Sequence, residues 1–494
     1  MSDGSRSPAR ILFRADGDAV IGSGHLRRCL ALADRLGEWG YECLFVCRAS
    51  TQSFNGLVHD AGFRLVELLG TFDAAYDADD MIGAVQGAGP FSALVVDHYR
   101  LDASWERKAR AVARRIAVID DLADRPHDCD LLLDVAPGDM TRYDPLVPAN
   151  CCKLLGPAYA LLRPEFARRR ADVQQRSGAV SRILVSFGGV DADNLTGRTI
   201  TAIRSALPDV AVDAVLTSLS PHRDALRRRA DADAKLTLHT DAAHMADLMA
   251  SADLAIGAGG STSWERACLG LPSIVVVIAE NQGVTAQALE HYGCAVALPT
   301  GPGFESELQE LVAWLSAHPA LLRLMSRAGY AAVDGRGIAR AAAAIAPPDI
   351  IVRPVAADEA RKIWEWRNSP EIRTTAVDPA EIPWEDHSAW FARRIADPQT
   401  AMLIGAAQGA DVGFIRFDLD GDTARVSIFL APEQAGRGIG RALLQAGERW
   451  IVARYPDIRR FHADVRPENG TSIALFRGAD YSAILSSFER IIND

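Results

Sequence analysis

Residues 256–272, IGAGGSTSWERACLGLP, decide the fold of this sequence. They run from an apolar stretch, LAIGA, through a turn at Gly259 and Gly260 into a helical stretch, and a second apolar run, SIVVV, begins at Ser273. Unbroken apolar runs are typical of strands buried on both faces, and a helix between two such runs indicates that the strands are parallel. The stretch therefore predicts part of a parallel sheet with helices packed against it.

The same alternation of apolar runs and helical stretches extends from Ile11 to about Leu298. A polar, arginine-rich interruption at residues 163–181 divides it into two series. We therefore expect an α/β fold with two Rossmann-like domains, residues 1–165 and 166–345, and a ligand between them that faces the carboxyl ends of the strands. The apolar runs that predict strands are ILF at 11–13, LFV at 44–46, ALVVD at 93–97, IAVID at 116–120, DLLLD at 130–134, ILVSF at 183–187, VDAVL at 212–216, LAIGA at 254–258 and SIVVV at 273–277.

A third domain, residues 350–494, is predicted after the paired prolines of APPDIIVR at 346–353, where an alanine-rich helix ends. Its pattern differs from that of the first two. A helix near residues 358–368 is followed by runs that are typical of antiparallel strands, and the sequence DGD at 420–422 is typical of a hairpin turn. This order predicts an α+β domain.

The composition is that of a globular protein. Of the 494 residues, 49% are apolar and 24% are charged, and the formal net charge of −11 disfavours nucleic acid as a general partner. The sequence has neither an apolar leader nor a run of about 18 apolar residues, so we expect a cytoplasmic chain without a membrane partner. Its eight cysteines lack the spacing of zinc ligands, and we expect no metal.

A catalytic candidate follows the first predicted strand. In RADGDAVIGSGHLRRC, residues 14–29, Gly22 and Gly24 permit a sharp turn, and His25 lies at the N-terminus of a helix, where the dipole disfavours a protonated imidazole. A neutral imidazole can act as a base near pH 7. Asp97, His98 and Tyr99, in VVDHY, follow another strand and belong at the same edge of the sheet. The alternative is a histidine that makes only a structural hydrogen bond.

Two glycine-rich turns predict a diphosphate site in the second domain. FGGVDADN at 187–194 follows a strand, and GGST at 259–262 joins a strand to a helix, so both can present backbone amides and hydroxyls to phosphate. Glu265 is suited to accept hydrogen bonds from ribose hydroxyls, or to cap its own helix. Asn281 and Gln282 offer amides to a sugar or a base, and buried structural amides are the alternative.

These blocks resemble known families. GAGGSTSWE followed by LGLP resembles the nucleotide-binding signature of the peptidoglycan N-acetylglucosaminyltransferase, which has two Rossmann domains in the GT-B arrangement. Over about residues 9–340, the chain is similar to the UDP-2,4-diacetamido-2,4,6-trideoxy-β-L-altropyranose hydrolases of pseudaminic acid biosynthesis. The blocks that carry this similarity are RADGDAVIGSGHLRRC, VVDHY, IDDLADRPHDCDLLLD, YALLRPEF, VSFGGVDADN, GAGGSTSWE and AENQ.

The resemblance implies hydrolysis of a nucleotide sugar, in which water attacks the anomeric carbon and UDP leaves. It implies a catalytic role for His25, with Tyr99 as a second catalytic candidate. The expected substrate contacts are Arg14, Asp16, Gly22, Gly24, Asn281 and Gln282. The expected UDP contacts are Gly188, Gly189, Gly259, Gly260, Ser261, Thr262 and Glu265.

The third domain carries a second ligand motif. The predicted strand ARVSIFL at 424–430 leads through a turn that contains three alternate glycines into a helix. Such a turn cradles a pyrophosphate, and the strand edge can pair with a pantetheine arm. The motif resembles the acetyl-CoA loop of GNAT-type N-acetyltransferases over about residues 350–490, which implies acetyl-CoA as co-substrate. The expected contacts are Phe429, Leu430, Gly436, Arg437, Gly438, Ile439, Gly440, Arg441 and Asn469.

Two positions depart from the GNAT pattern. Ala435 stands where the family usually has Gln or Arg, and residues 475–477, LFR, stand where many members carry a tyrosine general acid. The identity of the acid is therefore open, and Tyr481 is a candidate only by proximity. Candidates for a base that accepts the amine proton are Glu381, Glu385 and His387, with solvated-loop roles as the alternative.

The fusion predicts two consecutive reactions. In the pseudaminic acid pathway, acetylation of the 4-amino group of a UDP-sugar immediately precedes removal of UDP, so the third domain would make the substrate of the first two. The alternatives are a GT-B glycosyltransferase with an accessory acetyltransferase, and a regulatory module that binds a nucleotide sugar. The sequence leaves the oligomeric state and the stereochemistry of the sugar open.

Overall fold

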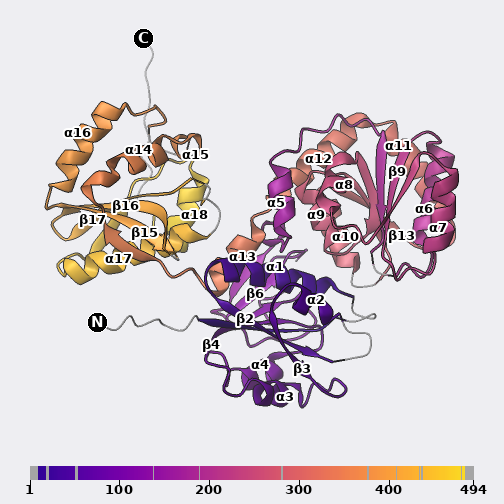
Figure 1. Cartoon of the computed structure of the whole chain (residues 1–494), viewed down its shortest axis with the longest axis horizontal. Helices are drawn as coiled ribbons and strands as arrows, with labels where there is room; N and C mark the ends of the chain where they lie inside the picture. Colours follow the sequence, from indigo (N-terminus) through magenta and orange to yellow (C-terminus); the bar gives the residue numbers. More distant parts are fainter. Residues whose placement is uncertain are drawn as a thin grey trace, which may run out of the picture. The chain divides into compact units, whose positions relative to one another are not determined.

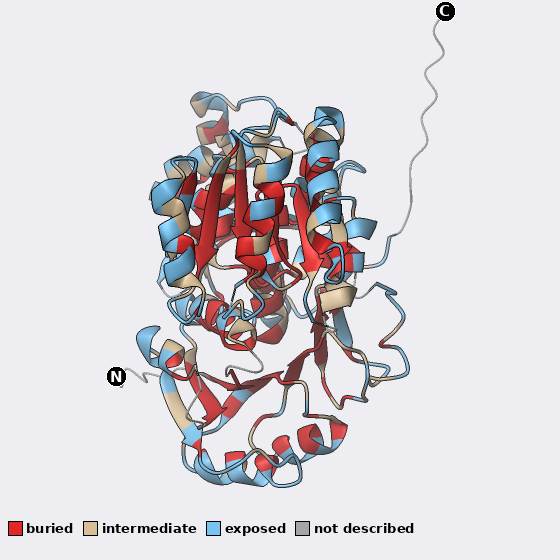
Figure 2. Ribbon diagram, turned by 90° about the vertical axis from the view of Figure 1, so that its right-hand side faces the viewer, coloured by how far each residue is buried: buried red, intermediate tan, exposed pale blue. Residues whose placement is uncertain are grey.

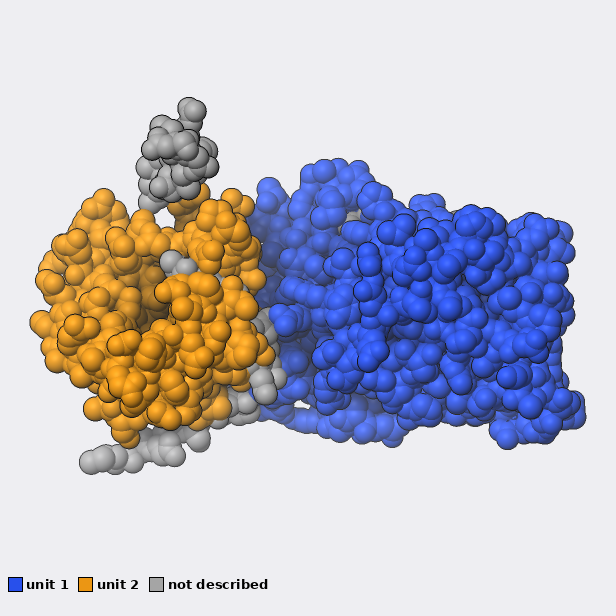
Figure 3. Space-filling model, turned by 90° about the horizontal axis from the view of Figure 1, so that it is seen from above, with its two compact units in different colours: residues 1–345 blue, residues 346–494 orange. Residues whose placement is uncertain are grey.

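The chain forms two compact units, residues 1–345 and residues 346–494 (Figure 3). Unit 1 contains two sheets and unit 2 contains one. The computed structural model describes residues 9–17, 22–49, 54–136, 138–188, 190–279, 282–374, 378–407, 409–432, 434, 438–479 and 481–483.

The first sheet of unit 1 has seven parallel strands in the order β3-β2-β1-β4-β5-β6-β7. The order reverses between β1 and β4, and such a switch point is the usual ligand position in a doubly wound sheet. Helices α1 and α2 lie on one face and α3 and α4 on the other (Figure 1). The bounds are β1 Arg10–Ala15, α1 Gly24–Glu38, β2 Glu42–Arg48, α2 Gly56–Asp60, β3 Arg64–Leu68, α3 Asp77–Ala84, β4 Phe91–Asp97, α4 Ala103–Ala109, β5 Ile116–Ile119, β6 Leu131–Asp134 and β7 Cys152–Leu155.

The second sheet has six parallel strands in the order β10-β9-β8-β11-β12-β13, with its switch point between β8 and β11. Helices α6 and α11 cover one face and α8 and α9 the other, which buries the strands between two apolar cores (Figure 2). The bounds are α5 Pro164–Arg170, β8 Arg182–Ser186, α6 Leu195–Ala206, β9 Ala211–Leu216, α7 Arg223–Ala232, β10 Leu236–Thr240, α8 Met245–Ser251, β11 Leu254–Ala258, α9 Thr262–Cys268, β12 Ser273–Val277, α10 Gln282–His291, β13 Ala295–Pro299, α11 Phe304–Ser316 and α12 Pro319–Ala332.

Two close approaches of the backbone explain glycines in unit 1. A Cβ at Gly257 of β11 would lie 2.0 Å from the carbonyl oxygen of Ser186 at the end of β8, so only glycine lets these strands meet. Helix α13 (Gly337–Ile345) packs against α1 and β6 of the first sheet. A Cβ at Gly337 would lie 2.3 Å from the carbonyl oxygen of Ala160, so glycine is also needed where this helix begins.

Unit 2 is a five-stranded mixed sheet in the order β14-β15-β16-β17-β18, in which only β17 and β18 are parallel. Helix α17 packs on one face, and α14 and α16 lie over the other (Figure 1). β17 pairs with β18 over residues 423–426, and among the described residues the last part of β17 has no ladder partner on that side. The bounds are β14 Ile351–Pro354, α14 Ala360–Asn368, α15 Pro370–Arg373, α16 Trp384–Ile395, β15 Thr400–Ala407, β16 Ala410–Asp420, β17 Thr423–Leu430, α17 Ile439–Arg454, β18 Arg460–Ala463 and α18 Gly470–Gly478.

The topology confirms the predicted pair of Rossmann-like sheets and the mixed third sheet. The hairpin predicted from DGD is also present, because Asp420 pairs with Thr423. The apolar runs did not predict β3, β7, β10 and β13. In the described part of the chain, no helix combines the length and the apolar character that crossing a bilayer requires. Seven of the eight cysteines are buried free thiols, and Cys152 is exposed.

Candidate active sites

The first candidate site surrounds His25 at the carboxyl edge of the first sheet. Gly22 has a φ of +84°, a conformation that favours glycine, and α1 begins two residues later. The side chain of His25 therefore enters the protein at the first turn of α1 and is 5% exposed. Burial lowers the pKa of His25, with the nearby Arg28 acting in the same direction and Asp97 opposing it. The imidazole is thus held in its neutral form at neutral pH.

Asp97 ends β4 and faces His25. Its two carboxylate oxygens accept hydrogen bonds of 2.6 Å from Nε and Nη2 of Arg28. Nδ1 of His25 lies 3.9 Å from Oδ1 of Asp97, and this nitrogen has no hydrogen-bond partner among the described residues. Burial alone would raise the pKa of Asp97, but the charge and the hydrogen bonds of Arg28 outweigh it and lower the pKa. Asp97 is therefore a buried carboxylate next to a neutral imidazole.

Tyr99 lies beside the same histidine. The two rings are in edge contact, with centroids 4.5 Å apart and planes at 78°. The structure thus brings together the two residues predicted to be catalytic, His25 and Tyr99, together with Asp97 from the strand end. An imidazole with an unbound ring nitrogen near a carboxylate has the chemistry of a general base, and such contacts commonly tighten only when a ligand is bound.

Arg14 and Asp16, predicted to contact the substrate, are hydrogen-bonded to each other. Arg14 is 0% exposed, and its guanidinium donates to both oxygens of Asp16 and to both oxygens of Asp77. Asp16 also accepts from the backbone N–H of Arg48. Burial alone would raise the pKa of Asp16, but hydrogen bonding from His98 and the charge of Arg14 lower it. We therefore assign Arg14 to holding Asp16 and Asp77 in place.

His98, one of the three candidates at the end of β4, fixes Asp16 from the neighbouring strand. Its Nδ1 accepts the backbone N–H of Arg100 at 3.1 Å, so the ring proton is on Nε2, which lies 3.2 Å from Oδ2 of Asp16. The ring also stacks on Phe72, with centroids 4.7 Å apart. The sequence signal was the position of His98 directly after the strand-ending Asp97.

The second candidate site lies at the switch point of the second sheet. Gly188, with a φ of +64°, follows the end of β8, and Gly259 and Gly260 follow β11. Both hydroxyl residues of the GGST turn, Ser261 and Thr262, are exposed and available to a ligand. Gly189 and Asn281, two of the predicted contacts, lie outside the described residues.

Gln282 has a structural role that the sequence did not separate from ligand binding. Its Oε1 accepts the backbone N–H groups of Gly259 at 3.1 Å and of Ile278 at 3.3 Å. It therefore fixes the GGST turn against the end of β12. Gln282 is half-buried, and its side chain has the structural role that the sequence left as the alternative; the N–H of Gly259 is already occupied.

Glu265, predicted to bind ribose, is buried on α9 and pairs with Arg163. Its two oxygens accept from Nε and Nη2 of Arg163 at 3.2 and 3.4 Å. Burial raises the pKa of Glu265, and the charge of Arg163 partly offsets that rise. The long hydrogen bonds leave this carboxylate with acceptor capacity for a ligand.

The third candidate site lies at the unpaired end of β17 in unit 2. Phe429 and Leu430 occupy that end, and Gly438, with a φ of +74°, leads into the helix N-terminus of α17. Ile439, Gly440 and Arg441 form the first turn of α17. Asn469 caps α18 by accepting the N–H of Ser472. Gly436 and Arg437, and the divergent Ala435, lie outside the described residues.

The acid and base candidates of unit 2 have structural partners. The hydroxyl of Tyr481 donates to Oε1 of Glu448 at 2.7 Å. His387 is 4% exposed, its Nε2 lies 3.1 Å from the carbonyl oxygen of Ala360, and burial lowers its pKa. Glu381 pairs with Arg373 on the surface. Glu385 is exposed in the first turn of α16.

Comparisons with known proteins agree with this geometry. A model of the acetyltransferase (GNAT) family matches residues 360–481, and a model of the glycosyltransferase family 28 C-terminal domain matches residues 228–333. The crystal structure of MurG from Acinetobacter baumannii aligns with a TM-score of 0.53 and 18% identity, over 68% of this chain and 99% of that one. The chain joins a GT-B region to a GNAT acetyltransferase domain.

Two relatives extend the comparison for the GT-B region. The chain is 33% identical over 193 residues to the spore coat polysaccharide biosynthesis protein SpsG of Bacillus subtilis. The aligned residues cover 38% of this chain and only 56% of SpsG. It is 27% identical over 291 residues to the UDP-2,4-diacetamido-2,4,6-trideoxy-β-L-altropyranose hydrolase of Campylobacter jejuni, covering 58% of this chain and 98% of the hydrolase. The GT-B region is thus related to nucleotide-sugar enzymes.

The GNAT domain implies the use of acetyl-CoA. The last residues of β17 suit the pantetheine chain, because this strand edge has no ladder partner among the described residues. The first turn of α17 suits the pyrophosphate, because a helix N-terminus presents N–H groups. Within the described ranges, no group of three or more His, Cys, Asp or Glu side chains is arranged to hold a metal ion.

Proposed function

We propose that this chain is a bifunctional enzyme of pseudaminic acid biosynthesis. Its GNAT domain transfers an acetyl group from acetyl-CoA to the 4-amino group of a UDP-4-amino-4,6-dideoxy sugar. Its GT-B region then removes UDP from the product, UDP-2,4-diacetamido-2,4,6-trideoxy-β-L-altropyranose. The observation that carries this proposal is the buried, neutral His25 with Nδ1 unbound beside Asp97, at the switch point of a region related to the hydrolase.

In the hydrolytic step, His25 is the base that accepts a proton from water. The oxygen of that water forms a bond to C1 of the sugar, and the bond between C1 and the phosphate oxygen breaks with its electron pair leaving on UDP. The imidazolium that forms is next to the carboxylate of Asp97, which stabilises its charge. Arg28 holds that carboxylate from the other side, so Asp97 keeps its position while the proton moves.

In the acetylation step, the free amine of the sugar attacks the carbonyl carbon of the acetyl thioester. The carbon–sulfur bond breaks, CoA leaves, and the amine gives up a proton. The unpaired end of β17 supports this assignment, because its free backbone groups suit an extended pantetheine chain. Tyr481 donates to Glu448, so we do not assign it as the group that protonates the CoA thiolate.

One time course tests the whole proposal. The full chain is mixed with a UDP-4-amino-4,6-dideoxy sugar, with and without acetyl-CoA, and products are followed by mass spectrometry. We expect the acetylated UDP-sugar to appear first and free UDP with the diacetamido sugar to follow, in the absence of any acceptor. UDP release that requires an added acceptor would favour a GT-B glycosyltransferase. Binding of the UDP-sugar with no turnover by either unit would favour a regulatory module.

A further inference from the structure

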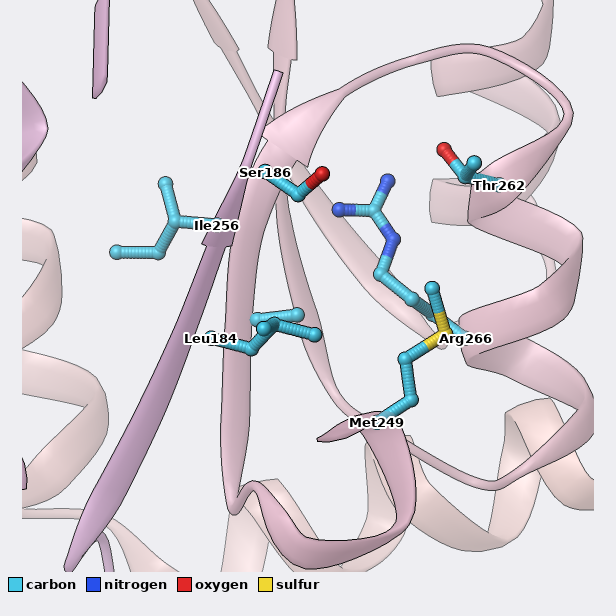
Figure 4. A pocket seen from close by; sticks show the side chains of 7 residues that line it. Leu184, Ser186, Met249, Ile256, Thr262 and Arg266 are labelled. Carbon is cyan, nitrogen blue, oxygen red and sulfur yellow. The ribbon is translucent and has the colours of Figure 1, made fainter. Parts of the chain in front are cut away.

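Arg266 is a buried cation beneath the GGST turn of the GT-B region. Its side chain on α9 is 3% exposed. Nη2 donates to the carbonyl oxygen of Ala258 at 2.8 Å and to Oγ of Ser263 at 2.7 Å, which places the guanidinium directly under the turn. Figure 4 shows the guanidinium in a small pocket between the hydroxyls of Ser186 and Thr262.

The guanidinium of Arg266 forms no ion pair in the described part of the chain, although the charge of the neighbouring Glu265 acts on it from a longer distance. No carboxylate in those ranges lies within 4.0 Å of its guanidinium, and its Nε is buried without an acceptor. The other buried arginines of unit 1 differ, since Arg14 is held by Asp16 and Asp77 and Arg48 by Asp77 and Asp80. Burial lowers the pKa of Arg266 to about 10, and the guanidinium stays protonated at neutral pH. A buried cation without an anion is costly, so this position is suited to an anionic ligand.

The surroundings of Arg266 indicate which anion would approach. The guanidinium lies where β8 and β11 end, and a Cβ at Gly257 would be only 3.0 Å from Nη1, so the glycine leaves room for it. Gly188 and Gly259 begin the two glycine-rich turns above this point. Both turns can present amides to phosphate oxygens. The charge of Arg266 therefore lies close to the ends of the two strands that lead into these turns.

We propose that Arg266 is a positioning residue for the diphosphate of the nucleotide sugar. It acts through the turn that it holds and through its charge, which stabilises the diphosphate in the complex and as the leaving group departs. This inference rests on the proposed function, because it assumes that a uridine diphosphate binds at this switch point. It predicts that Arg266 contributes to phosphate recognition and does not contribute to uridine recognition.

The test compares two ligands that differ only in the diphosphate. Dissociation constants of UDP and uridine are measured by calorimetry for the full chain and for Arg266→Met, which keeps most of the apolar stem and removes the charge. We expect UDP affinity to fall about tenfold to a hundredfold, the effect of one charge across a partly screened site, with uridine affinity unchanged. Ser263→Ala is the matched control, because it removes a hydrogen bond to Arg266 and keeps the charge, so the ratio of the two constants should stay near wild type.

Three results separate the possible failures. An equal fall for UDP and uridine, or an unchanged ratio, would overturn the role of Arg266 and leave the proposed function standing. A wild-type chain that binds neither ligand would overturn the proposed function itself. If Arg266→Met does not fold, the test uses Arg266→Lys with inorganic pyrophosphate as the ligand. Pyrophosphate should raise the melting temperature of the wild type more than that of the lysine variant. Equal shifts in melting temperature would overturn the inference.

Discussion

Nδ1 of His25 lies 3.9 Å from Oδ1 of Asp97, while both oxygens of that carboxylate accept hydrogen bonds of 2.6 Å from Arg28. Arg28 holds the carboxylate of Asp97 in place, whereas Nδ1 of His25 has no hydrogen-bond partner among the described residues. A small rotation of the imidazole would bring it into hydrogen-bond distance, as catalytic contacts commonly do when substrate binds. In the structure, the charge of Asp97 acts on the imidazole across 3.9 Å without a hydrogen bond between them.

Substituting His25→Asn should remove the base while keeping a polar side chain of similar size. We expect the rate of UDP release to fall by about 10²–10⁴-fold, the usual contribution of a general base, with UDP affinity unchanged. The measurement is single-turnover hydrolysis with calorimetric binding of UDP. His291→Asn, on the exposed end of α10, is the control and should hydrolyse normally. Hydrolysis by His25→Asn at the wild-type rate would contradict the assignment.

The pH profile of hydrolysis should have an acidic limb set by His25. Because burial lowers its pKa, the neutral form persists below the ordinary value of about 6.5, and activity should be lost only as pH falls through the lower pKa of the folded protein. Asp97 opposes that shift, so Asp97→Asn should move the limb to still lower pH and reduce the maximal rate. The dependence of kcat/KM on pH checks both. A limb that moves to higher pH in Asp97→Asn would exclude this pairing.

The strands that form the centres of the sheets could be predicted from sequence, because their side chains are buried on both faces and read as unbroken apolar runs. β4 is an example, with ALVV entirely buried. β3 could not be predicted in this way, because it lies at an edge of the sheet. Its sequence, RLVEL, mixes exposed charged residues with half-buried apolar ones. The edge strands β7, with CKLL, and β10, with LTLHT, share this character.

The candidate sites could be predicted to the level of the sheet edge, but their partners could not. We could predict that His25, Asp97 and Tyr99 lie at one edge of the sheet, because each follows a strand and the carboxyl ends of parallel strands share an edge. Which arginine meets which carboxylate depends on residues far apart in sequence. Arg14 binds Asp77, which lies in α3, and this pairing has no local signal. The same holds for Gln282, whose amide was equally suited to a ligand or to the backbone.

Gly257→Ala should destabilise unit 1. The new Cβ would lie 2.0 Å from the carbonyl oxygen of Ser186, so β8 and β11 would have to separate at their switch point. We expect a loss of about 2 kcal/mol in the free energy of unfolding, as for other overpacked cores. Gly260→Ala, where a Cβ meets no atom within 4 Å, is the matched control and should unfold at nearly the wild-type urea concentration. Equal urea midpoints for the two variants would show that the strands tolerate the added carbon.

Tyr481→Phe should affect the stability of unit 2 more than its chemistry. The hydroxyl donates to the partly buried Glu448, and burial together with that carboxylate raises the pKa of Tyr481, which makes it a poor proton donor. Its removal leaves Glu448 without that donor and should lower the free energy of unfolding by about 1–2 kcal/mol. Acetyl-CoA consumption should stay close to wild type. A fall of about 10²-fold, the size of a general acid's contribution, would instead identify Tyr481 as the acid.

Glu265→Gln should remove recognition of the ribose. Within the described ranges, the two oxygens of the carboxylate accept only the long hydrogen bonds from Arg163, and ribose hydroxyls would add donors to it. Hydrogen bonds to a charged group contribute about 1.5–3 kcal/mol, so the wild type should bind UDP at least tenfold more tightly than 2′-deoxy-UDP. In Glu265→Gln that preference should largely disappear. Arg163→Lys is the control, because it keeps a cation beside Glu265 and should retain the preference for UDP. If Glu265→Gln distinguishes the two nucleotides as well as the wild type does, the carboxylate belongs to the packing of α9 against Arg163 and not to the nucleotide site.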